Sequence, residues 1–125
     1  MLRKGGKTEK RLKRLLHRVH RPQWAQVAGI ELPLKHPLIT PPIQRDIYFG
    51  DYERKELDLI ERRLQPGDTV MEVGAGIGFL SAYCARALGD DRVFAYEANP
   101  ALLALIADVH ARNGVHPRVT QALLG

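Results

Sequence analysis

The sequence predicts an α/β fold in which parallel strands are joined by helices, and three observations carry that prediction. From residue 68 onwards, short strand-like runs alternate with runs of helical length. A glycine-rich turn, Gly74 to Gly78, directly follows the first of these strands. Turn and cap residues separate the runs that follow. Strands that alternate with helices of this length form a parallel sheet with right-handed crossovers. We therefore expect a three-layer α/β unit.

Each element of this unit has its own local signal. Asn99 suits the N-cap of a helix that has Pro100 at its first position, and Gly114 lies just past the end of that helix. This is the asymmetry that helix termini favour. In chain order, the predicted elements are a helix at 51–64 with Asp51 as its N-cap, a strand at 69–73, a helix at 77–88, a strand at 92–97, the helix that begins at Pro100, and a strand at 118–124.

Two segments precede this unit. Residues 1–21 form a basic tail in which Leu12, Leu15, Leu16 and Val19 share one face of a predicted helix at 8–20. We favour a solubilising helix or a frayed terminus. The alternative is a weak anchor on an anionic membrane surface or an acidic partner.

Residues 22–50 contain four prolines between positions 33 and 42, so we expect an irregular Pro-rich connector. A short strand from Ile47 to Phe49, with a turn at Gly50, is the regular structure that we expect near its end. The domain organisation is therefore a tail at 1–21, a connector at 22–50 and the α/β unit at 51–125.

The charge distribution argues against a nucleic-acid-binding protein, although the net charge is +5. Residues 1–21 hold nine Lys and Arg residues and one acid, whereas residues 22–125 hold ten bases and 13 acids. A globular nucleic-acid binder would carry its excess of bases on the folded domain. The single cysteine, Cys84, suits a reducing compartment, and we expect a cytoplasmic protein. The five histidines have no metal-ligand spacing, so no metal site is predicted.

The segment from Glu72 to Gly78 has the residue pattern of a ligand-binding turn. Its alternating glycines, at 74, 76 and 78, let a ligand approach the backbone at the start of a helix, where N–H groups are unpaired. Glu97 ends the next strand, 21 residues after Gly76, and its carboxylate can accept both hydroxyls of a ribose. A nicotinamide-dinucleotide fingerprint would require Gly or Ala at position 79, where this chain has Phe. The pattern therefore predicts an adenosine cofactor, with an NAD-type oxidoreductase fragment as a less favoured alternative.

These motifs resemble those of class I S-adenosylmethionine-dependent methyltransferases, and more narrowly the FkbM family. The resemblance rests on PGDTVMEVGAGIGFLSAYCA at 66–85 and VFAYEANP at 93–100, with GDYERKE at 50–56 and NGV at 113–115. It implies a Rossmann-like fold and S-adenosylmethionine as the cofactor. The cofactor-binding residues that it implies are Glu72 near the amino group, Gly74, Ala75, Gly76 and Gly78 around the methionine and ribose, Glu97 on the ribose hydroxyls, and Ala98 beside the adenine.

The resemblance also implies O-methylation of a hydroxyl on a sugar or small natural product, which makes a small molecule or glycan the expected partner. It covers about residues 48–125, which supply three of the seven strands of that fold. We therefore expect a fold truncated after its third strand, with the first strand left at an open edge. No catalytic residue can be assigned. The alternative function is a truncated, non-catalytic module that binds the cofactor or another chain.

Overall fold

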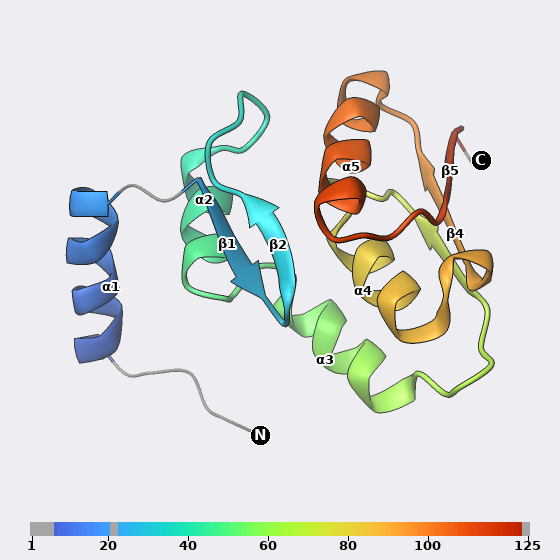
Figure 1. The fold of residues 1–125 in the computed structure, drawn as a ribbon, viewed down its shortest axis with the longest axis horizontal. Helices are drawn as coiled ribbons and strands as arrows, with labels where there is room; N and C mark the ends of the chain where they lie inside the picture. Colours follow the sequence, from blue (N-terminus) through green and yellow to red (C-terminus); the bar gives the residue numbers. More distant parts are fainter. Residues whose placement is uncertain (1–6, 21–22, 124–125) are drawn as a thin grey trace. The chain divides into compact units, whose positions relative to one another are not determined.

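The structure is a computed structural model that describes residues 7–20 and 23–123, with the side chains of 15–20 left out. The chain divides into two compact units, Met1–Arg54 and Lys55–Gly125. The first unit contains the tail, the connector and residues 51–54, and the second contains the rest of the expected α/β unit (Figure 1).

The first unit is built around a β-hairpin that the proline-rich sequence did not predict. Strand β1 spans Trp24–Val27 and pairs antiparallel with β2, Ile30–Pro33. The two residues between them, Ala28 and Gly29, both have positive φ, at 50° and 81°. A two-residue turn with both φ values positive matches the twist of paired strands. The expectation of an irregular segment is therefore wrong for these residues.

Helix α2, Pro41–Tyr48, replaces the short strand expected at Ile47–Phe49. Two prolines occupy the first two helical positions, where no backbone N–H is needed and a φ near −65° is already helical. These prolines were expected to keep the segment irregular, although they start a helix here. Ile47 is fully buried and anchors the helix in its unit.

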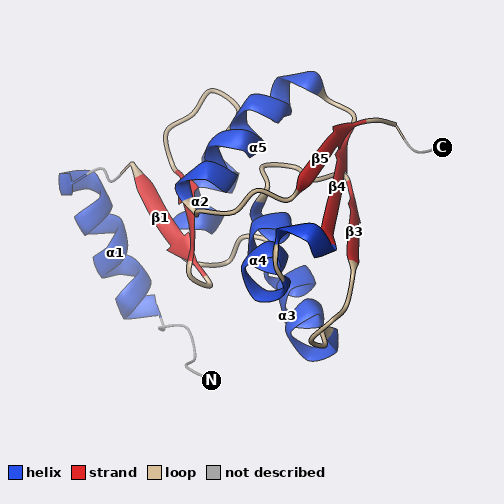
Figure 2. Cartoon of the chain, turned by 45° about the vertical axis from the view of Figure 1, so that its right-hand side comes forward, coloured by secondary structure: helices blue, strands red, loops and turns tan. Residues whose placement is uncertain are grey.

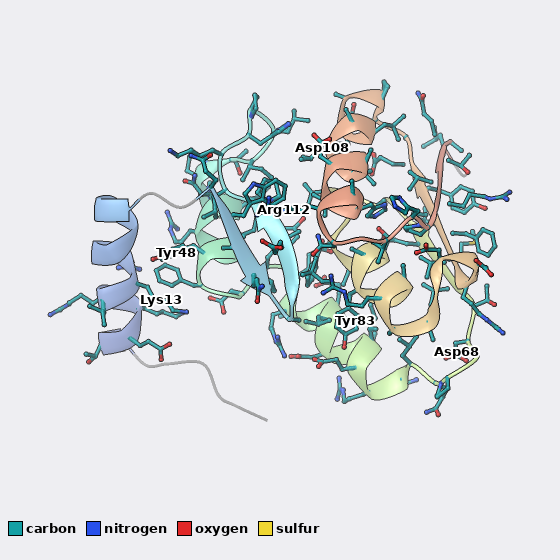
Figure 3. All side chains as sticks on the ribbon, viewed as in Figure 1. Lys13, Tyr48, Asp68, Tyr83, Asp108 and Arg112 are labelled. Carbon is teal, nitrogen blue, oxygen red and sulfur yellow. The ribbon has the colours of Figure 1, made fainter. Side chains whose placement is uncertain are left out.

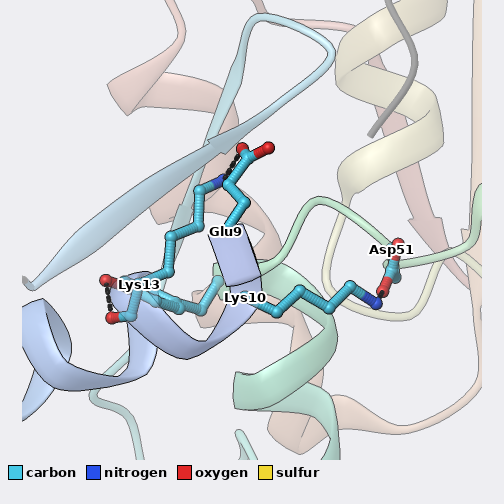
Figure 4. Close-up of polar contacts among 5 residues, drawn as sticks. Glu9, Lys10, Lys13 and Asp51 are labelled. Carbon is cyan, nitrogen blue, oxygen red and sulfur yellow. Dashed lines mark hydrogen bonds and ion pairs between the residues drawn. The ribbon is translucent and has the colours of Figure 1, made fainter. Parts of the chain in front are cut away.

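The predicted basic helix is present as α1, Lys7–His20, and it contacts the end of α2. Tyr48 points toward α1 (Figure 3), and its hydroxyl donates to the backbone carbonyl of Lys13. Lys10 lies 3.4 Å from Asp51 (Figure 4), and its ammonium group also lies 5.7 Å from the centre of the Phe49 ring. The helix is therefore attached to its unit through its basic residues.

The apolar stripe of α1 is only partly described. Leu12 is 55% exposed, so this leucine is not buried within the unit. The side chains of Leu15, Leu16 and Val19, which complete the predicted stripe, lie outside the described ones. None of the described helices is long and apolar enough to cross a membrane.

Helix α3, Arg54–Arg63, begins three residues later than predicted. Its first residue follows a turn in which the N–H of Arg54 donates to the carbonyl of Asp51. Asp51 therefore precedes a turn, and its carboxylate pairs with Lys10. Leu57 is fully buried and fixes this helix in the second unit.

The second unit contains the predicted parallel sheet, and the order of its strands is β3-β4-β5. Strand β3 spans Val70–Val73, β4 spans Val93–Glu97 and β5 spans Arg118–Gln121. Both pairings are parallel, with Val73 opposite Tyr96 and Glu97 opposite Gln121. The α/β fold class and the parallel sheet are therefore confirmed, and β3 lies at an edge as expected. The predicted strand end at residue 124 lies outside the described residues.

Two helices connect these strands and lie on the same side of the sheet (Figure 2). They are α4, Phe79–Leu88, which a short 3₁₀ turn at Asp90–Arg92 joins to β4, and α5, Pro100–Arg112. The side-chain oxygen of Asn99 accepts the N–H of Ala101 at 3.0 Å, which confirms the predicted N-cap. The sheet face toward these helices is buried, with Val93 and Ala95 almost inaccessible to solvent.

The opposite face of the sheet is bare in the described part of the chain. Side chains alternate along a strand, so Met71 and Val73 share this face with Phe94 and Tyr96 of the neighbouring strand. Met71 is 60% exposed and Val73 is 62% exposed. The described residues thus contain two of the three layers that the fold class implies, a helix layer and a sheet.

Candidate functional site

The candidate site lies at the carboxyl ends of β3 and β4, where the glycine turn leaves the sheet. The carbonyl of Tyr96 accepts the N–H of Gly74 at 2.8 Å and the N–H of Ala75 at 3.1 Å. This pair of bonds extends the parallel ladder past the end of β3. The turn then reverses through Gly74, Gly76 and Gly78, whose φ angles are 84°, 58° and 91°. Only glycine adopts such angles freely, so the three glycines are required by the path of the backbone.

Glu97 joins this turn to the start of the next helix. Its Oε1 accepts the N–H of Gly76 at 3.0 Å, and its Oε2 accepts the N–H of Asn99 at 3.0 Å. Glu97 is 8% exposed, whereas the neighbouring Ala98 is exposed. The Glu97 carboxylate is therefore buried and hydrogen-bonded to two loops.

The predicted site residues divide into two groups. Gly74, Gly76 and Glu97 meet at the carboxyl end of the sheet through the bonds just described, and Ala98 follows Glu97 directly in the chain. Glu72 is half-buried on the helix-covered face of β3 and lines a cavity of about 220 Å³ together with Leu80, Ser81, Cys84 and residues of α3 and β3. The side chain of Glu72 therefore faces α4 rather than the open side of the turn.

Two of the predicted residues contribute to the core. Ala75 is 2% exposed and packs with Ala95 and Ile106. Gly78 is buried, and a Cβ built on it would lie 3.1 Å from Nε2 of His110 and 3.3 Å from Ile106. These two residues pack the turn against α5.

Two polar residues behind the turn were missed by sequence reasoning. Ser81, in the first turn of α4, and His110, near the end of α5, are 1% and 3% exposed. The Oγ of Ser81 lies 2.8 Å from Nε2 of His110. Burial lowers the pKa of His110 below its ordinary value of 6.5, so the ring is neutral at pH 7. The 29 residues between these side chains left no local signal that they would meet.

Cys84 is a core residue. It is 1% exposed, and burial together with the nearby charge of Glu72 raises the pKa of its thiol to about 11. A thiol with this pKa stays protonated at neutral pH and is a poor nucleophile. Within the described residues, no group of three or more His, Cys, Asp and Glu side chains is placed to hold a metal ion.

Comparison with known proteins agrees with this geometry. The chain is 32% identical over 101 residues to the ribosomal protein L11 methyltransferase of Thermus thermophilus. The matched residues cover 81% of this chain and 38% of that protein. It is 30% identical over 97 residues to the arginine N(omega)-methyltransferase of Streptomyces achromogenes, and this match covers 78% of this chain and 25% of that protein. The chain is related to methyltransferases.

The structural comparison supports the same fold. A coclaurine N-methyltransferase bound to N-methylheliamine and SAH superposes with a TM-score of 0.51 at 21% identity, over 97% of this chain and 39% of that one. The chain therefore has the Rossmann-like fold of class I methyltransferases and spans less than two fifths of the length of these proteins. No protein-family model matches the chain, so the FkbM resemblance rests on the sequence motifs.

Proposed function

We propose that this chain is the cofactor-binding part of an S-adenosylmethionine-dependent methyltransferase. The observation that carries the proposal is the junction of the glycine turn with Glu97, at the carboxyl ends of two adjacent parallel strands. Ligands of open α/β sheets bind at such strand ends. The relatedness to methyltransferases supports this cofactor rather than a dinucleotide.

The residues at this junction fit an adenosine group. A Cβ built on Gly74 would have no atom within 4 Å, so a ligand has room to approach the backbone there. Each oxygen of Glu97 accepts one backbone N–H, and a carboxylate oxygen has lone pairs for two hydrogen bonds. Both oxygens therefore keep the capacity to accept a ribose hydroxyl. The exposed Ala98 is the residue next to them, in the position proposed for the adenine edge.

The cofactor supplies an activated methyl group on a sulfonium centre when it is bound. The role that we propose for this chain is binding and orientation. Glu97 holds the ribose, and the backbone of Gly74 to Gly78 lies along the rest of the molecule. Holding two reactants in line is a large part of the acceleration that such a transfer needs. We assign no described residue to the deprotonation of the methyl acceptor.

Two chemical classes of methyl acceptor follow from different observations. The family resemblance favours a hydroxyl of a sugar or small natural product, whereas two of the compared proteins are N-methyltransferases by name. Transfer of a labelled methyl group to hydroxyl-bearing sugars, to arginine peptides and to small amines separates these classes. Labelling of amines alone would exclude the O-methylation that the resemblance implies.

Protection from thermal unfolding tests the cofactor. S-adenosylhomocysteine should raise the unfolding midpoint of the 125-residue chain in a concentration-dependent way, because a ligand that binds the folded state stabilises it. NAD should leave the midpoint unchanged. A shift with NAD alone would indicate an oxidoreductase fragment, and no shift with either ligand would favour a non-catalytic module that binds another chain. Asp91→Asn, at an exposed acid that precedes β4, is the matched control and should respond like the wild type.

A further inference from the structure

A buried polar chain supports the glycine turn from the side of the helices. The carbonyl oxygen of Gly78 accepts the hydroxyl of Ser81 at 3.3 Å, and the same hydroxyl lies 2.8 Å from Nε2 of His110. Gly78 is the N-cap residue of α4, so this chain of contacts runs from α5 through α4 to the last residue of the turn. Both side chains are almost completely buried.

One assignment of protons satisfies both contacts of the Ser81 hydroxyl. A hydroxyl has one hydrogen, and when Ser81 donates it to the carbonyl of Gly78, the hydroxyl oxygen accepts from His110. In this assignment Nε2 of the ring is the donor. A neutral His110 that is protonated on Nε2 completes a directed chain of two hydrogen bonds that ends on Gly78.

The ring of His110 also restricts the turn sterically. Gly78 has a φ of +91°, and the space where a Cβ would lie is bounded by Nε2 of His110 at 3.1 Å. Upstream, the N–H of Gly78 donates to the carbonyl of Ala75 at 2.9 Å, and the next residue, Gly76, donates to Glu97. The orientation of Gly78 is thus linked to that of Gly76 by two short steps along the backbone.

We propose that Ser81 and His110 are positioning residues that hold the glycine turn in the conformation that receives the cofactor. They act through Gly78 and do not touch the ligand themselves. This inference rests on the function proposed above. It adds two residues on the far side of the turn, which no part of the glycine motif includes.

Three variants separate the hydrogen bond from packing. His110→Phe keeps a ring of similar size and removes the donor, whereas His110→Gln supplies an amide N–H in its place. Ser81→Ala removes the central hydroxyl with the smallest change in volume. Val109→Ala is the matched control, because Val109 is a fully buried residue of the same helix and is not among the atoms that approach Gly78.

Calorimetric titration with S-adenosylhomocysteine at 20 °C is the measurement, with circular dichroism to show that each variant is folded. We expect Ser81→Ala and His110→Phe to bind about five- to tenfold more weakly than wild type, which corresponds to the loss of one buried hydrogen bond. His110→Gln should recover most of the affinity. Val109→Ala should bind like the wild type although its thermal midpoint falls.

The outcomes distinguish this inference from the proposed function. If the wild type does not bind S-adenosylhomocysteine, the proposed function fails and the inference fails with it. If the wild type binds and folded Ser81→Ala and His110→Phe bind equally well, the positioning role is overturned while the proposed function stands. Equal losses in His110→Phe, His110→Gln and Val109→Ala would show that these residues support stability alone.

Discussion

Glu97 accepts the backbone N–H of Gly76 at 3.0 Å, across 21 residues of sequence, and this bond ties the end of β4 to the middle of the glycine turn. The second oxygen of the same carboxylate accepts the N–H of Asn99 at 3.0 Å. Glu97 therefore stabilises the two loops even without a ligand. The hydroxyl-binding role proposed for it would use the remaining lone pairs of the carboxylate oxygens.

This double role changes what a substitution at Glu97 should do. Glu97→Ala removes an acceptor from two backbone N–H groups, and we expect a loss of about 1–3 kcal/mol in the free energy of unfolding as well as weaker binding of S-adenosylhomocysteine. Glu97→Gln keeps one acceptor oxygen but turns an NH₂ group toward the other N–H, so it should be intermediate in both properties. Urea denaturation and calorimetric titration measure the two effects. An Ala variant as stable as the wild type would show that the two bonds contribute nothing.

Substitution of Gly78 by alanine should lower the free energy of unfolding more than the same substitution at a glycine with open space around its Cβ position. Gly78→Ala places a Cβ 3.1 Å from His110 and 3.3 Å from Ile106 in a left-handed conformation. Gly67 has a similar φ, +88°, with no atom within 4 Å of its Cβ position, so Gly67→Ala measures the backbone strain alone.

We expect about 1 kcal/mol of destabilisation for Gly67→Ala and about 2–3 kcal/mol for Gly78→Ala, because crowding adds to strain. The difference between the two variants in urea denaturation is the quantity of interest. Equal losses would mean that the helix layer yields to the added methyl group without cost.

The buried His110 should make stability depend on pH below neutrality. Its pKa is lowered in the folded state by burial, with a further lowering from His116 and opposing effects from the Gly78 carbonyl and Asp90. The unfolded chain therefore binds more protons than the folded chain as pH falls through 6.5, the ordinary value. The contribution of the neutral His110 to the free energy of unfolding is fully present above that pH. It is lost progressively as the pH falls from there to the folded-state pKa.

Thermal midpoints of the wild type and His110→Gln between pH 8 and pH 5 check this prediction. The difference between the midpoints of the two proteins at each pH cancels the contributions of the titratable groups that they share. We expect the wild type to lose stability more steeply than the variant as the pH falls. Parallel curves for the two proteins would contradict the lowered pKa of His110.

Cys84 should be inert while the chain is folded. With its pKa near 11, the thiolate fraction at pH 8 is about one in a thousand, and the side chain is 1% exposed. Iodoacetamide at pH 8 should therefore modify it at least about a hundredfold more slowly in buffer than in 6 M guanidinium chloride. Rapid labelling of the folded chain, followed by mass spectrometry, would show that α4 opens far more often than its burial implies.

Most of the second unit could be predicted locally. The parallel strands, the N-cap at Asn99 and the glycine turn follow from short stretches whose propensities and spacings agree with the final structure. The first unit was predicted less well, since Pro41 and Pro42 were interpreted as breakers and Ala28 is an unusual residue for a two-residue hairpin turn. Local rules fail there because the hairpin pairing decides the conformation of its own turn.

By itself, the sequence determined the α/β class, the parallel strands and the 21-residue separation that brings an acid to the glycine turn, because these depend on neighbours along the chain. Only the tertiary structure decided that Glu97 is bound to two loops, that Glu72 faces α4, and that His110 meets Ser81 behind Gly78. Those relationships arise when α4 and α5 pack on one face of the sheet. A side chain's position on its own helix leaves open which residue of the next helix it will meet.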